Sequence, residues 1–300
     1  MNKDAGTEGR MPVPGGVLHY RVSGPQAAKD VVVFENGLTA SLVSAAWLEE
    51  ALAPHVRLVT YDRPGIGEST STEPLTMARI TEQFLALLAG LGISQPVVVA
   101  GHSYGGLIAA LHAVQVPGRV RALVQVDPTP EEDFGQDKMI DGMPAMLRFS
   151  KILVRLGLGG RIYSAYRELP PAVYARIMQD RDWMIRCLVG SIPEIELFHP
   201  IRNALTVSND LRNCRRLVIS AAPESQELGP VTRLLLSKDK RLAMANRVVE
   251  VHQRQAGQND ASRWTSLPYS HISLISNRES AQQIANSTLE FIKSLPQGKI

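Results

Sequence analysis

Short apolar runs rich in β-branched residues alternate with segments of helical periodicity along most of the chain. Residues 31–34, 56–61 and 96–100 are continuous apolar runs, a pattern typical of strands that are buried on both faces of a sheet. Residues 17–22 instead alternate between apolar and polar positions, which predicts an antiparallel strand at the edge of the sheet. Further strands are predicted at residues 120–126, 217–220 and 263–267. The pattern therefore predicts an α/β fold with a mostly parallel central sheet flanked by helices.

Helical periodicity is clear in two segments. Directly after a glycine-rich turn, apolar residues recur on one helix face at Leu107, Ala110, Leu111 and Val114. The same spacing returns near the C-terminus at Ala281, Ile284, Ala285, Leu289 and Ile292. Ser276 and Glu279 have the spacing of a capping box, so the last helix is expected to begin there.

The long segment between the strands at 120–126 and 217–220 has no strand pattern. We interpret residues 129–212 as an inserted helical cap, which leaves residues 1–128 and 213–300 as the core. Methionine and aromatic residues in the cap either line a pocket or pack in its interior: Met139, Met143, Met146, Phe149, Tyr163, Tyr166, Tyr174, Met178, Trp183 and Met184. Basic residues among the aliphatic residues of 149–166 favour a solvated helix face over a membrane-surface helix.

The composition excludes several classes of protein. With 44% hydrophobic and 20% charged residues, the chain is an ordinary globular protein. The net charge is +3 and the basic residues are dispersed among acidic ones, so a nucleic-acid partner is not expected. The first 16 residues lack the apolar run of a secretory signal, and no apolar stretch is long enough to cross a bilayer. We therefore expect a cytoplasmic location without stable membrane insertion.

The cysteines give no sign of a disulfide scaffold or of a metal site. Cys187 and Cys214 are the only two, and they are far apart in the sequence. Both are expected to be buried as small apolar side chains. We expect neither a bound metal nor a cofactor.

Residues 101–106, Gly-His-Ser-Tyr-Gly-Gly, carry the strongest chemical signal in the sequence. They form a G-x-S-x-G motif between a buried strand and a helix, where a sharp turn exposes the hydroxyl of Ser103. The glycines are needed because a Cβ at either position would clash with neighbouring backbone. A phosphate-binding loop is excluded because the segment lacks the lysine, and the other glycine-rich turn, at 65–67, lacks the third glycine of a dinucleotide site.

On these motifs the chain resembles the α/β-hydrolase family from Val17 to Ile292. Residues 61–69, Tyr-Asp-Arg-Pro-Gly-Ile-Gly-Glu-Ser, are similar to the family's D-x-R-G-x-G-x-S turn. The resemblance implies a cap between strands 6 and 7 of the family's count. It also implies that the backbone N–H groups of Leu38 and Tyr104 form an oxyanion hole. This chain has Asn36 where the family usually has histidine before Gly37. We expect Arg63 to brace its turn through an ion pair or a carbonyl contact.

A serine nucleophile needs a base, which in this family follows the last strand. Of the seven histidines only His271 has that position, whereas His102 is expected to point elsewhere. The acid that orients the base has two candidates. Glu224 has the spacing that most relatives use after the seventh strand, and Asp127 ends the preceding strand. The degraded turn before Glu224 favours Asp127.

These residues together predict a serine hydrolase. We expect it to cleave an ester, thioester or lactone bond of a small apolar molecule through an acyl-enzyme on Ser103. Two alternatives stay open at this point: acyl transfer with the same residues, and a ligand-binding protein of this fold without turnover.

Overall fold

A computed structural model describes residues 6–132, 135, 137–225 and 237–296. In this part of the chain one nine-stranded sheet has the order β1-β2-β4-β3-β6-β7-β8-β9, with β5 paired to β2. Its strands are β1 (Thr7–Val13), β2 (Gly16–Ser23), β3 (Val31–Glu35), β4 (Arg57–Tyr61), β5 (Thr70–Ser71), β6 (Val97–His102), β7 (Val120–Val126), β8 (Arg216–Ala221) and β9 (Arg263–Leu267). The strands from β4 to β9 along this order are parallel, which confirms the predicted α/β class.

The prediction for residues 17–22 was half right. They form β2, which is antiparallel to its neighbours, but β2 is not the edge strand because β1 pairs with its outer side. The residues of β1 are exposed or half-buried and include Pro12, so this edge strand has no apolar run that would reveal it in the sequence.

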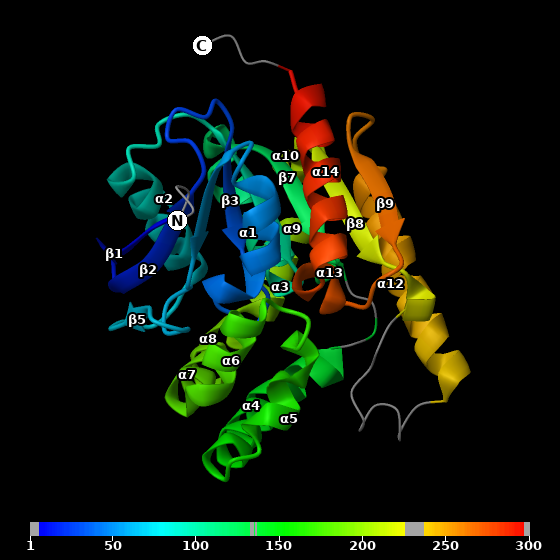
Figure 1. Cartoon of the computed structure of the whole chain (residues 1–300). Coiled ribbons are helices and arrows are strands. Elements are labelled where there is room, and N and C mark those ends of the chain that lie inside the picture. Colours follow the sequence, from blue (N-terminus) through cyan, green and yellow to red (C-terminus); the bar gives the residue numbers. More distant parts are fainter. Residues whose placement is uncertain (1–5, 133–134, 136, 226–236, 297–300) are drawn as a thin grey trace.

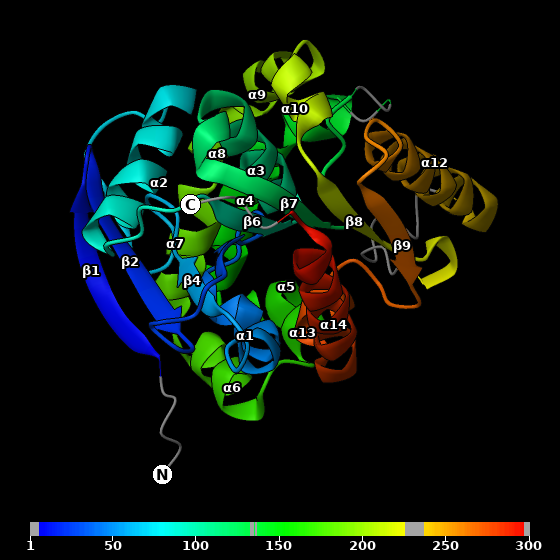
Figure 2. The same ribbon diagram turned by 90° about the horizontal axis from the view of Figure 1, so that it is seen from above.

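Helices cover both faces of the sheet (Figure 2). One face carries α1 (Ala46–Leu52) and α14 (Arg278–Ser294), and the other carries α2 (Met77–Gly90), α3 (Tyr104–Gln115) and α12 (Lys238–Ala256). Residues 104–113 of α3 are all buried, because other helices pack against the side that faces away from the sheet. The predicted amphipathic pattern therefore identified the helix but understated its burial.

The segment between β7 and β8 is helical. It contains α4 (Asp137–Arg155), α5 (Gly159–Ile162), α6 (Pro171–Gln179), α7 (Arg181–Gly190), α8 (Ile192–Glu196), α9 (Phe198–Thr206) and α10 (Asn209–Asn213). Helices α4 to α7 lie together beyond one end of the sheet (Figure 1), whereas α9 and α10 pack against α3. Tyr163, Trp183 and Met184 are buried inside the segment, while Met139, Met146 and Phe149 are exposed.

Three smaller expectations can be compared with the structure. Helix α14 is capped by the side chain of Asn277 and not by Ser276, which is buried in the short helix α13 (Ser273–Ser276) that precedes it. Cys187 is buried as predicted, but Cys214 is only half-buried. None of the helices within the described residues combines the length and the apolar character that a membrane span requires.

Candidate active site

Ser103 lies in the tight turn between β6 and α3. Its backbone has φ 56° and ψ −124°, a conformation that costs free energy for any residue with a Cβ. The surrounding backbone leaves no room for further side chains. A Cβ on Gly101 would lie 2.3 Å from the Gly105 oxygen, and a Cβ on Gly105 would lie 2.1 Å from the Glu35 oxygen. The two glycines therefore allow the strained turn that presents the serine hydroxyl.

His271, in the loop between β9 and α13, lies between Ser103 and Asp127. Its Nε2 is 2.9 Å from Ser103 Oγ, and its Nδ1 is 2.6 Å from Asp127 Oδ2. A carboxylate can only accept, so Nδ1 carries a proton and Nε2 is free to accept the hydroxyl proton of the serine. This is the geometry in which a serine can be activated as a nucleophile.

Asp127 is held rigidly just beyond the end of β7. Its φ is 41°, its N–H donates to the Ile219 carbonyl at 2.6 Å, and its Oδ1 accepts from the Ala221 N–H at 3.0 Å. Burial raises the pKa of Asp127, but the hydrogen bond and the charge interaction with His271 outweigh burial and lower it well below its usual range. The carboxylate therefore stays charged at every pH at which the protein would be assayed.

The other candidate acid lies elsewhere. Glu224 is exposed in the short turn η4 (Pro223–Ser225). In the part of the chain that the structure describes, the carboxylate that is hydrogen-bonded to His271 is that of Asp127 and not that of Glu224. The structure therefore brings Ser103, His271 and Asp127 together and leaves Glu224 apart.

Among the described residues His102 makes no hydrogen bond with the Ser103 hydroxyl, as expected, but it lies beside the base, His271. Its ring lies 4.6 Å from the ring of His271, and its Nε2–H donates to the His271 carbonyl at 2.8 Å. Burial, helped by the nearby His271, lowers the pKa of His102 to about 3, so its ring stays neutral. His102 thus fixes the backbone of the loop that carries His271. One sign of this role was available in the sequence, which is the position of His102 directly before Ser103.

A second histidine, which nothing in the sequence singled out, lies beside Asp127. His252 on α12 is fully buried, with Nδ1 3.9 Å from Asp127 Oδ1. Burial lowers the pKa of His252, so the ring is neutral, and it donates from Nε2 to the Pro128 carbonyl at 2.8 Å. Its Nδ1 accepts from the Ser220 hydroxyl at 2.9 Å. These bonds join the loop after β7 to the neighbouring strand β8.

The loop after β3 lies directly beside the serine. A Cβ on Gly37 would lie 3.4 Å from Ser103 Cβ, so the backbone just before Leu38 lies close to the serine. Within the described residues, the backbone N–H groups of Leu38 and Tyr104 take part in no hydrogen bond. Asn36, the departure from the family pattern, donates from its side chain to the Tyr61 carbonyl at 3.4 Å.

Arg63 connects this loop to the helical segment. Its guanidinium donates to the carbonyl oxygens of Asn36 and Gly37 and forms an ion pair with Glu194 of α8. The predicted ion pair and carbonyl contacts of Arg63 are thus both present. Glu194 was not predicted, because its partner is 131 positions away in the sequence.

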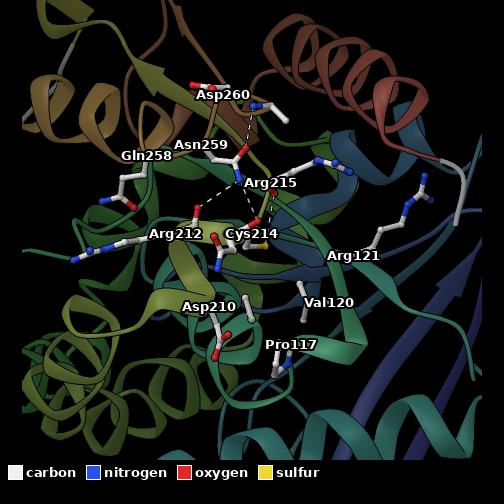
Figure 3. Close-up of a pocket in the computed structure, with 13 residues that line it drawn as sticks. Pro117, Val120, Arg121, Asp210, Arg212, Cys214, Arg215, Gln258, Asn259 and Asp260 are labelled. Atoms are coloured by element: carbon white, nitrogen blue, oxygen red, sulfur yellow. Dashed lines mark hydrogen bonds between the residues drawn. The ribbon is translucent and has the colours of Figure 1, made fainter.

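The cavity shown in Figure 3 lies at the end of the sheet away from Ser103. It has a volume of about 670 Å³ and lies near the first residues of β7, β8 and β9, lined by Val120, Cys214 and Ala261 among others. Ser103 follows the last residue of its strand, at the other end. The side chains of Arg212 and Arg215, which both line the cavity, point away from each other (Figure 3).

The chain is similar to known hydrolases in sequence and in fold. The model of the alpha/beta hydrolase family matches residues 32–277. The pimeloyl-[acyl-carrier protein] methyl ester esterase of Serratia marcescens is 33% identical over 114 residues, covering 38% of this chain and 41% of that protein. The sn-1-specific diacylglycerol lipase of Mus musculus is 32% identical over 121 residues, covering 40% and 38%.

These alignments span about two fifths of the length of the curated relatives. Among solved structures, the enol-lactonase of Burkholderia xenovorans LB400 aligns with a TM-score of 0.63 over 95% of this chain and 100% of the other, at 23% identity. At that identity the likeness shows a shared fold.

Proposed function

Because the chain belongs to the alpha/beta hydrolase family, we propose that it is a serine hydrolase that cleaves an ester, thioester or lactone bond through an acyl-enzyme on Ser103. One observation carries the proposal: His271 lies within hydrogen-bond distance of Ser103 on one side and of Asp127 on the other. The relatives named as an ester esterase and a lipase support the same class of bond.

In the first step Ser103 Oγ attacks the carbonyl carbon while its proton passes to Nε2 of His271. The bond from Oγ to carbon forms, and the carbonyl π electrons move to the oxygen. Asp127, which stays charged, stabilises the imidazolium that results. The oxyanion would accept from the N–H groups of Leu38 and Tyr104, and the positive end of α3 adds to that stabilisation.

The tetrahedral intermediate then collapses. The bond to the leaving alcohol or thiol breaks, and His271 returns the proton to the leaving group. Water attacks the acyl-enzyme with His271 again as base, which releases the acid and restores Ser103. No external oxidant, reductant or cofactor is needed to balance these steps.

The helical segment supplies the binding region in this proposal. Helices α4 to α7 lie beyond the end of the sheet at which the parallel strands β6, β7 and β8 terminate (Figure 1). We therefore assign them as the part of the 129–212 cap that covers the substrate. The apolar side chains of this segment suit a small apolar acyl group. The cytoplasmic location and the absence of a nucleic-acid partner stay predictions.

Hydrolysis of short p-nitrophenyl esters tests the proposal. We expect Ser103→Ala to keep the fold and to lower kcat by about 10⁴-fold, because no other described group can take the place of the hydroxyl. Adding methanol as a competing acceptor separates the alternatives: a transferase forms the methyl ester preferentially, whereas a hydrolase forms mainly the acid. A wild-type protein without turnover, or an alanine variant that keeps a tenth of the rate, contradicts the proposal.

A further inference from the structure

A buried ion pair, Arg63 with Glu194, contacts the loop that carries one backbone donor of the proposed oxyanion hole and the side chain of Tyr104, which carries the other. Arg63 is 3% exposed and Glu194 is 1% exposed. From this arrangement we propose that Arg63 is a positioning residue that aims the Leu38 N–H at the oxyanion, and that Glu194 of α8 holds Arg63 in place. The inference rests on the proposed function, since it concerns the same reaction.

Arg63 holds the Gly37 carbonyl in place. Arg63 Nη2 donates to the Gly37 oxygen at 3.1 Å, and Nη1 donates to the Asn36 oxygen. The Gly37 oxygen and the Leu38 N–H belong to one planar trans peptide, in which the two groups point in opposite directions. The hydrogen bond that holds the Gly37 oxygen toward Arg63 therefore holds the Leu38 N–H pointing away from Arg63. It also polarises the peptide and strengthens the N–H as a donor.

Glu194 determines where the guanidinium lies. Arg63 Nε is 2.5 Å from Glu194 Oε1, and Nη2 is 3.0 Å from Oε2, which is a two-point contact with one carboxylate. A second carboxylate, Glu35, lies 3.7 Å from Nη1. Burial lowers the pKa of Arg63, but the two carboxylates more than compensate and raise it, so the charge is permanent.

The same pair contacts the residue that supplies the second donor. The Tyr104 hydroxyl donates to the Glu194 backbone oxygen at 2.5 Å, and the Arg63 guanidinium lies 5.8 Å from the centre of the Tyr104 ring. The loop is also held further along, where the Thr39 N–H donates to Ser191 Oγ at 2.9 Å. Ser191 and Glu194 both belong to the helical segment, so that segment fixes the oxyanion loop at two points.

Direct substrate binding by Arg63 is a poorer explanation of these contacts. Its side chain is almost fully buried, and its donors are directed at two carbonyls and a carboxylate of the protein itself. The role available to it is to act through the Leu38 peptide.

Arg63→Lys tests the inference. Lysine keeps a positive charge beside Glu194 but cannot donate to both carbonyls in the fixed plane of a guanidinium. We expect kcat for a p-nitrophenyl ester to fall about 10- to 100-fold, because a small misplacement of a catalytic group lowers the rate by that order. KM should change less than about threefold. Glu194→Gln should give a smaller loss in the same direction, and it supplies a second variant if Arg63→Lys folds poorly.

The matched control is Arg216→Lys. Arg216 is also fully buried and paired with a carboxylate, Glu131, at 3.0 Å, but it contacts neither donor residue. Arg216→Lys should lower the free energy of unfolding by about as much as Arg63→Lys does, while it keeps the wild-type kcat. A trifluoromethyl ketone gives a readout without turnover, because its adduct with Ser103 carries an oxyanion. Its affinity should fall with kcat/KM in Arg63→Lys, whereas the affinity of the matching secondary alcohol stays constant.

An Arg63→Lys variant with wild-type kcat and ketone affinity overturns the inference, as does a loss confined to KM. Equal losses in Arg63→Lys and Arg216→Lys also overturn it, because they indicate a general effect of destabilisation. Failure of the proposed function is a different result, since it appears in the wild-type protein as the absence of both turnover and ketone adduct.

Discussion

Asp127 uses its two carboxylate oxygens for different purposes. Oδ2 accepts from His271, while Oδ1 accepts from the Ala221 N–H of the adjacent strand. The sequence favoured Asp127 over Glu224 only narrowly, because spacing cannot show which way the chain turns after a strand. In the structure the turn after β8 leaves Glu224 exposed, and the positive φ of Asp127 directs its side chain to the imidazole. Such a turn depends on backbone angles that residue type predicts poorly.

We predict that Asp127→Asn lowers kcat by about 10³- to 10⁴-fold, because an amide can favour the wrong tautomer of His271. The Asn oxygen can still accept from Ala221, so the thermal melt should stay close to that of the wild type. Glu224→Gln is the control and should keep both rate and stability. A large loss in the Glu224 variant, or similar small losses in both, would show that another group orients the base.

At the scale of elements, the helical segment is docked closely on the core. Gly190 ends α7 directly against the turn that contains Gly65, and a Cβ on Gly190 would lie 2.0 Å from the Gly65 oxygen. The clash is with backbone, which cannot move away as a flexible side chain can. Gly142 on α4 offers a contrast, since nothing lies within 4 Å of the position of its Cβ.

Gly190→Ala should therefore lower the free energy of unfolding by about 1 to 3 kcal/mol. Gly142→Ala should raise it by about 0.5 to 1 kcal/mol, because alanine favours the helix. Urea unfolding of the two variants and the wild type measures both effects. Gly190→Ala should also lower kcat, because the shifted segment carries Glu194. A Gly190→Ala variant that is as stable as the wild type would contradict the close approach of Gly190 to the Gly65 backbone.

The elements that the sequence predicted best are those with continuous burial. Strands β3 and β6 are buried at every position, and an apolar run is the direct consequence. The edge strand β1 and the N-cap Asn277 were missed for the opposite reason. The side chains of β1 are exposed or only half-buried, and a cap depends on one local hydrogen bond that several polar residues nearby could make.

For the whole molecule, the topology brings distant residues together. Ser103, Asp127 and His271 follow three parallel strands, β6, β7 and β9, whose carboxyl ends lie at one edge of the sheet. This convergence is why strands that are recognisable in the sequence allowed these three residues to be predicted as neighbours. The pairing of Arg63 with Glu194 could not be predicted, because it depends on how the helical segment folds back onto the core.

The stability of the molecule should depend on pH through His102. Burial, with His271 nearby, lowers its pKa to about 3 from the ordinary value of 6.5, so below pH 6.5 the unfolded chain binds a proton that the folded chain does not. Acid therefore favours unfolding. From pH 7 to pH 5 this one residue should lower the free energy of unfolding by about 2 kcal/mol.

His102→Gln removes this contribution and keeps a side-chain donor for the His271 carbonyl. His252, whose pKa is also lowered, acts in the same direction, whereas His19, whose pKa is raised, stabilises the fold below pH 6.5 and loses that effect at higher pH. The difference between wild type and variant isolates His102. Urea unfolding from pH 5 to pH 7 should give a flatter curve for the variant, and two parallel curves would contradict the prediction.

Covalent labelling with a fluorophosphonate tests whether Ser103 is an activated nucleophile, because the reagent reacts with a serine only when a neighbouring base activates it. We predict one adduct per chain in the wild type, located by peptide mass spectrometry at Ser103. No adduct is expected in Ser103→Ala, and labelling of His271→Ala should be strongly slowed. A folded wild-type protein that stays unlabelled, or an adduct that persists in Ser103→Ala, would contradict the assignment of Ser103 as the nucleophile.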